Sequence, residues 1–122
     1  MEENRMIDIA HRNLLGVFGE RDPQVRATVI EEIYTEGVRF ADPDGVVTGR
    51  EALGKKAQHL LDEAAGFVFT TAGPARVTQN LVLLPWHFGP AGQPPVASGV
   101  DVSIVEDGRI AQLYTLLDPP AA

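Results

Sequence analysis

Hydrophobic residues recur at helical spacing in the first third of the chain. Residues 6–18 place apolar side chains three or four positions apart, and Gly19 follows, which predicts an amphipathic helix ending there. Its buried stripe is predicted at Ile7, Ala10, Leu14, Leu15 and Phe18. Asp22 and Pro23 are typical of a helix N-cap and first turn, and Gly37 is the expected glycine at the end of this second helix. Its buried stripe is predicted at Val25, Val29, Ile30, Ile33 and Tyr34.

A third helix is predicted after residue 48. Thr48 and Glu51 have the spacing of a capping box, and Gly66 stands where the helix should end. Its apolar face is predicted at Leu53, Ala57, Leu60, Leu61 and Ala64.

The pattern changes to strands from Phe67 onward. Four segments rich in β-branched and aromatic residues, FVFTT, ARVTQNLVLLPWHF, VASGVDVSIV and RIAQLYTLL, are separated by turn signals. A short strand at 38–42 and a turn at 42–45 precede the third helix. Helices first and strands last predict an α+β fold, with the helices on one face of a curled antiparallel sheet and an apolar cavity between them.

Composition narrows the class of protein. The 122 residues fit a single domain spanning 1–122, and a 44% hydrophobic content is enough for one core. A net charge of -7 argues against nucleic-acid and membrane partners and favours a neutral or apolar small molecule. The chain has no cysteine, no glycine-rich nucleotide motif and no signal-peptide pattern, so we expect no cofactor and a cytoplasmic protein.

Two aspartates are the candidate catalytic residues. Asp42 shares one face of its strand with Val38 and Phe40, which predicts a carboxylate facing the interior, although the same residue also reads as turn punctuation. Asp101 alternates with Gly99 and Ser103 on one strand face, and the opposite face is wholly apolar. Because the sheet face toward the helices should be covered, Asp101 is the stronger candidate for a cavity carboxylate.

Four features follow one another along the chain: Asp22, FADPDG, TGREAL and SGVDVSIVEDGRIAQLYTLLD. With these features in this order, the chain resembles the nuclear-transport-factor-2-like superfamily, particularly its SnoaL-like members. Ketosteroid isomerase and polyketide cyclases are enzymatic relatives. The resemblance implies a cone-like, curled mixed or antiparallel sheet of the cystatin-like class wrapped around helices. It also implies a ligand entering the open mouth and a homodimer formed through the outer sheet face.

The same resemblance implies roles for the aspartates. Asp42 takes the place of the isomerase's base, and Asp101 takes the place of the acid that donates a hydrogen bond to the developing oxyanion. Leu14 and Ala57 stand where the isomerase has tyrosine hydroxyls, which argues against steroid isomerisation. The expected function is a cofactor-independent isomerase or cyclase acting on an apolar carbonyl compound. The alternative is a non-catalytic ligand-binding or accessory dimerisation module.

Further residues are expected to form the ligand site. If Trp86 faces the cavity then His87 faces outward, whereas a bulge at Pro85 would exchange them. His11 and His59 have no partner at metal-ligand spacing, so no metal is expected. The residues expected to contact a ligand are Leu14, Phe18, Tyr34, Phe40, Leu61, Trp86, Ser103, Leu113 and Leu117.

Overall fold

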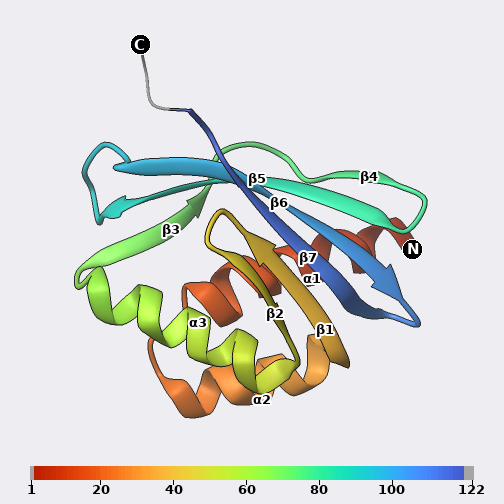
Figure 1. Cartoon of the computed structure of the whole chain (residues 1–122). Helices are drawn as coiled ribbons and strands as arrows, with labels where there is room; N and C mark the ends of the chain where they lie inside the picture. Colours follow the sequence, from red (N-terminus) through yellow and green to blue (C-terminus); the bar gives the residue numbers. More distant parts are fainter. Residues whose placement is uncertain (1, 120–122) are drawn as a thin grey trace.

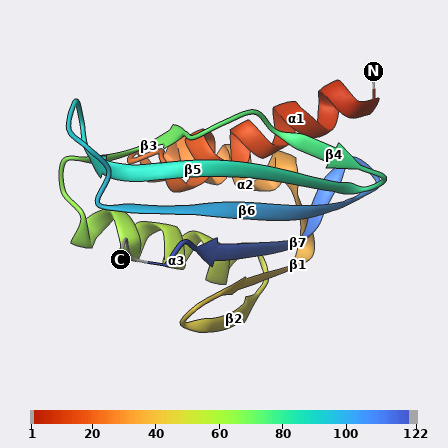
Figure 2. The ribbon, with the colours of Figure 1, turned by 90° about the horizontal axis from the view of Figure 1, so that it is seen from above.

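One curved sheet with helices on a single side makes up the computed structural model, which describes residues 2–119 (Figures 1 and 2). The helical elements within these residues are α1 (Glu2–Asn13), its π-helical continuation η1 (Leu14–Phe18), α2 (Pro23–Ile33) and α3 (Arg50–Glu63). The strands are β1 (Tyr34–Asp42), β2 (Gly45–Thr48), β3 (Phe67–Thr71), β4 (Arg76–Thr78), β5 (Leu81–Pro90), β6 (Ala97–Glu106) and β7 (Arg109–Leu117).

The seven strands of the described residues form a mixed, open sheet. Its order is β2-β1-β7-β6-β5-β3. Strand β4 pairs with residues 81–83 of β5, on the same edge along which β3 pairs with residues 86–90. The β1–β7 pair is parallel, whereas the remaining pairs are antiparallel. Figure 1 shows α2 and α3 beneath the sheet, with α1 passing behind them under β5 and β6. The α+β prediction of helices held against one side of a curled sheet is therefore confirmed.

The end of the first helix departs from the predicted regular stripe. The backbone N–H of Gly19 donates to the carbonyl oxygen of Leu14, five residues earlier, at 2.8 Å, which closes a π-helical turn. The wider turn rotates the following side chains around the helix axis. Leu15, predicted to be buried, is 48% exposed, and Val17 is buried instead.

Two boundaries were also wrong in the prediction. Helix α2 ends at Ile33, so Gly37 lies inside β1 and not at a helix terminus. Within this helix, Val25 was predicted to be buried but is 48% exposed. At the start of α3 the N-cap is Gly49, with a φ of 97°, and no side chain caps the helix, so the predicted capping box at Thr48 does not form.

The long segment predicted before Pro90 contains two strands. Gln79, with a φ of 51°, turns the chain between β4 and β5. Pro85 occupies the position on β5 between the residues that pair with β4 and those that pair with β3. A proline, which has no N–H, is tolerated at such a break in the edge pairing.

The single domain predicted over 1–122 stays a prediction, and Met1 and residues 120–122 lie outside the described residues. Among residues 2–119, no helix is long and apolar enough to cross a membrane.

Candidate functional site

A cavity of about 450 Å³ lies between the helices and the inner face of the sheet. Aromatic rings form much of its wall. Phe69 stacks on Phe88 with ring centroids 4.2 Å apart and meets Trp86 edge-on at 5.4 Å. The aromatic residues of the wall are Phe18, Phe40, Phe67, Phe69, Trp86 and Phe88. Such a wall favours a flat, apolar ligand.

Strand pairing brings polar residues into one row across the cavity. Thr115 on β7 pairs with Asp101 on β6, and Ala41 on β1 pairs with Tyr114, so Asp42 comes level with Thr115. Neighbouring strands lie about 4.8 Å apart, which places the backbones of Asp42 and Asp101 roughly 10 Å apart. All three polar residues line the cavity. A ligand could therefore contact both carboxyl groups at once.

Asp101 is the buried polar centre of the cavity, with 6% of its surface exposed. Its Oδ1 accepts hydrogen bonds from Trp86 Nε1 at 3.0 Å and from Thr115 Oγ1 at 2.7 Å. Its Oδ2 accepts one hydrogen bond from Asn13 Nδ2 at 3.1 Å. Oδ1 thus has two donors and Oδ2 has one, which leaves Oδ2 the greater capacity for a bond to a ligand.

Burial raises the pKa of Asp101 to about 6, although the hydrogen bonds from Thr115, Trp86 and Asn13 lower it in part. The pKa of this carboxyl group therefore lies much closer to neutral pH than the 3.8 of an ordinary aspartate. A group with a pKa near the working pH is suited to proton exchange.

Asn13 and Tyr34 lie behind Asp101, away from the cavity. Both side chains are fully buried, and the Tyr34 hydroxyl donates to Asn13 Oδ1. Burial and the nearby charge of Asp101 raise the pKa of Tyr34 well above its ordinary value, so its hydroxyl remains a donor. A continuous hydrogen-bonded chain therefore runs from Tyr34 through Asn13 to Asp101.

Asp42 is both a turn residue and a residue of the cavity lining. Its Oδ1 accepts from the backbone N–H of Asp44 at 2.9 Å, as a turn residue does, and its Oδ2 lies 2.9 Å from Lys56 Nζ. The Asp42 side chain is 15% exposed and lies at the cavity mouth. The carboxylate is thus held by the turn and by an ammonium group, yet it borders the cavity.

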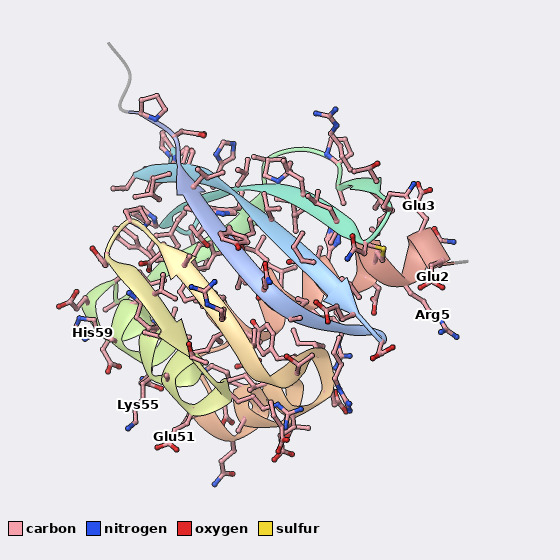
Figure 3. The ribbon with its side chains drawn as sticks, turned by 45° about the vertical axis from the view of Figure 1, so that its right-hand side comes forward. Glu2, Glu3, Arg5, Glu51, Lys55 and His59 are labelled. Atoms are coloured by element: carbon pink, nitrogen blue, oxygen red, sulfur yellow. The ribbon has the colours of Figure 1, made fainter. Side chains whose placement is uncertain are left out.

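The mouth carries more acidic than basic groups. Lys56 also lies 3.7 Å from Asp44, and His59 pairs with Glu63 at 3.3 Å. Figure 3 shows His59 on the solvent-facing side of α3. The acidic residues that line the cavity and its mouth are Asp42, Asp44, Glu63 and Asp101. Four carboxyl groups against one ammonium disfavour an anionic ligand.

The structure separates the expected ligand residues into two groups. Five line the cavity, and four pack in the surrounding core. The cavity residues are Leu14, Phe18, Phe40, Trp86 and Leu117. The core residues outside the lining are Tyr34, Leu61, Ser103 and Leu113. The two predicted catalytic residues, Asp42 and Asp101, both line the cavity.

Trp86 faces inward and His87 lies on the opposite face, where its Nδ1 is 2.8 Å from Ser98 Oγ. Pro85 therefore does not exchange their orientations. Among the described residues no group of three or more His, Asp or Glu side chains could hold a metal ion.

Three polar residues of the site were missed from the sequence. Thr115 alternates with Leu113 and Leu117 on the strand face that points toward the helices, so the strand pattern could have indicated it. Lys56 reads as an ordinary exposed helix residue, and Asn13 reads as the polar end of an amphipathic helix. Neither carried a signal, because their contacts depend on how α1 and α3 pack against the sheet.

The family model for the SnoaL-like domain matches residues 12–113. No curated protein sequence matches the chain.

Solved structures share the whole fold at low sequence identity. A proposed isomerase of the SnoaL-like family from Agrobacterium tumefaciens is 23% identical, covers 95% of this chain and 99% of its own, and has a TM-score of 0.88. A proposed SnoaL-like polyketide cyclase from Jannaschia sp. is 16% identical over 94% and 86% of the two chains, with a TM-score of 0.77. A proposed ketosteroid isomerase from Kribbella flavida is 16% identical over 98% and 84%, with a TM-score of 0.67. These likenesses establish the fold.

Proposed function

Because the chain belongs to the SnoaL-like domain family, we propose that it binds a neutral, apolar carbonyl compound and transfers a proton on it without a cofactor. The reaction is of the isomerase or cyclase type. The observation that carries the proposal is Asp101, a buried carboxyl group with a pKa of about 6 in an aromatic cavity. Proton abstraction next to a carbonyl requires a base that is ionised at working pH and close to an apolar substrate.

The proposed step is redox-neutral. Asp101 takes a proton from the carbon next to the carbonyl, and the electron pair of the broken C–H bond forms the enolate. The proton then returns to the same carbon or to a conjugated one. This assigns Asp101 the role of base, in place of the donor role that the resemblance implied, because Asn13, Trp86 and Thr115 all donate hydrogen bonds to its oxygens, which favours the ionised, proton-accepting form. Asp42 and Lys56 would hold the polar end of the ligand at the mouth.

A test uses 2-tetralone, a neutral bicyclic ketone with acidic C–H groups. Saturable quenching of Trp86, the one tryptophan of the sequence, measures binding, and deuterium uptake from D₂O followed by NMR measures proton transfer. We expect exchange above the buffer rate, rising with pH through about 6. Asp101→Asn should lower the enzymatic exchange by roughly a hundredfold or more, because general-base catalysis contributes about that factor.

Controls in the same experiment separate the two aspartates. A larger loss in Asp42→Asn than in Asp101→Asn would return the base role to Asp42. The anion 2-naphthoate should bind more weakly than 2-tetralone at pH 8, since the cavity lining is acidic. Equal binding of both would contradict the proposed preference for neutral ligands.

A non-catalytic binding module is the second candidate function. It is favoured by Leu14 and Ala57, both apolar and buried where the isomerase carries hydroxyls. Saturable quenching by 2-tetralone with no exchange above the buffer rate would support this candidate and reject the enzymatic one.

We further propose that two copies of the chain associate through the outer face of the sheet. Side chains that point away from the helices form an apolar face there, and no helix of residues 2–119 covers it (Figure 1). This outer apolar face comprises Leu81, Leu83, Val100, Val102, Ile104, Tyr114 and Leu116. A contiguous apolar face of this kind is typical of an association surface.

Leu116→Glu is expected to convert the dimer to a monomer. Leu116 is 58% exposed at the outer apolar face, and a carboxylate there would lose its water on association. Light scattering after size exclusion, at micromolar protein, measures the mass. Val25→Glu, on the exposed side of α2, is the matched control and should remain dimeric. A monomeric wild-type chain would contradict the proposal.

A further inference from the structure

The hydrogen-bonded chain behind the cavity has a direction that determines how Asp101 is held. The Tyr34 hydroxyl donates to Asn13 Oδ1, which turns the amide so that Nδ2 donates to Asp101 Oδ2. Oδ2 is also the oxygen with spare capacity for a ligand, since Trp86 and Thr115 both bond to Oδ1. The position of the reactive oxygen therefore depends on the orientation of one amide.

We propose that Tyr34 and Asn13 are positioning residues for Asp101: the tyrosine hydroxyl fixes the asparagine amide, and the amide fixes the ionised carboxylate with Oδ2 available to the cavity. Neither residue lines the cavity, so both act through Asp101 and not on the ligand. The inference rests on the proposed function only in taking Asp101 as the reacting group.

The alternative arrangement of the chain explains why the tyrosine matters. If the Asn13 amide turned over, its Oδ1 could accept a hydrogen bond from the protonated carboxyl group of Asp101. Its Nδ2 would then donate to the Tyr34 oxygen. The Tyr34 hydroxyl hydrogen would then need another acceptor at a fully buried site, where Asn13 is its one hydrogen-bond partner among residues 2–119. An unmade buried hydrogen bond is costly, so Tyr34 disfavours the turned amide and favours the ionised carboxylate.

Other charges near Asp101 belong to the cavity and not to this chain of hydrogen bonds. The residues that pack beside Asp101 from β5 and β7, Trp86 and Thr115, carry no titratable group. The titratable groups that share the cavity with Asp101 come from α3 and from β1 with its turn, and they are Asp42, Asp44, Lys56, His59 and Glu63. These groups are unchanged in variants of Tyr34 and Asn13.

The test is a pH titration of the Asp101 carboxyl carbon by NMR on the ligand-free protein, with the resonance assigned from Asp101→Asn. Tyr34→Phe keeps the ring that packs in the core and removes only the hydroxyl. We expect the pKa of Asp101 to rise from about 6 by roughly 0.5 to 1 pH unit, the effect of losing one hydrogen bond in the chain. Asn13→Leu, which removes the direct donor, should raise it by about one unit or more.

A matched control is available because the sequence has only two tyrosines. Tyr114 lies on the outer face with its hydroxyl bonded to Gln112, so Tyr114→Phe should leave the Asp101 titration unchanged. An unchanged or lowered pKa in a folded Tyr34→Phe would overturn the proposal. If Asn13→Leu fails to fold, Tyr34→Phe alone decides. Because the titration needs no ligand, its result stands whether or not 2-tetralone is bound or exchanged.

Discussion

Asp101→Asn is expected to abolish a loss of folding stability that the wild type shows as pH rises. Through Asp101, the wild type should lose about 3 kcal/mol of its free energy of unfolding between pH 4 and pH 8. The folded-state pKa of Asp101 is about 6 and its ordinary value is 3.8. A raised carboxyl pKa means that the folded state holds its proton more tightly than the unfolded state. Its contribution to stability is therefore complete below pH 4 and is lost as pH rises through 6. A difference of about two pKa units corresponds to roughly 3 kcal/mol at 1.36 kcal/mol per unit.

The measurement compares urea unfolding of the wild type and of Asp101→Asn at several pH values and one protein concentration. The wild type should lose stability relative to the variant as pH rises, while the other carboxyl groups contribute equally to both proteins and cancel. Asp8→Asn, which removes an exposed carboxyl group on α1, is the matched control for the loss of one carboxyl group. Parallel profiles for the wild type and Asp101→Asn would contradict a raised pKa at Asp101.

The two aspartates show which part of the site the sequence could predict. Asp101 was predicted from alternation with Gly99 and Ser103, and a strand's two-residue period depends little on the rest of the fold. The same period placed Asp42 beside Phe40 on the inner face of β1. Its ion pair with Lys56 could not be predicted, because that contact requires α3 to pack beside the β1–β2 turn.

Helix faces were harder to predict than strand faces. A regular 3.6-residue period assigned Leu15 to the interior, and one π-helical turn in η1 was enough to expose it. In α2 the apolar pattern assigned Val25 to the core, but the buried position is taken by Arg26, whose guanidinium donates to Gln58 on α3. Neither composition nor the spacing of apolar residues predicts a buried arginine whose guanidinium is bonded to a neutral side chain.

The hydrogen bonds of Asn13 and Tyr34 behind Asp101 could not be predicted from the sequence, for a related reason. Tyr34 reads as the end of the α2 stripe, yet it is the first residue of β1, and Asn13 is the last residue of α1. Both occupy element ends, where small shifts of a boundary decide whether a side chain points inward or outward. The fold, in contrast, follows from the order of elements along the chain, which such shifts do not alter.

Gly99→Ala is expected to destabilise the chain by about 2 kcal/mol and to displace Trp86 from Asp101. A Cβ at position 99 would lie 2.3 Å from the Leu116 carbonyl oxygen and 2.7 Å from the Trp86 ring. The carbonyl belongs to β7, the strand paired with β6, so relief requires the two strands to separate locally or the ring to move. Movement of the ring would stretch the 3.0 Å bond from Trp86 Nε1 to Asp101 Oδ1.

Urea unfolding measures the loss of stability, and the emission of the single tryptophan reports the displaced ring. Gly37→Ala in β1 is the matched control, because a Cβ there would meet no atom within 4 Å. That variant should be neutral or gain a few tenths of a kcal/mol from the smaller entropy of its unfolded state. Since Trp86 is one of the donors that lower the pKa of Asp101, Gly99→Ala should also raise that pKa further above 6. Equal stabilities and equal emission in the two variants would show that close contact with Gly99 does not hold the tryptophan over the carboxyl group.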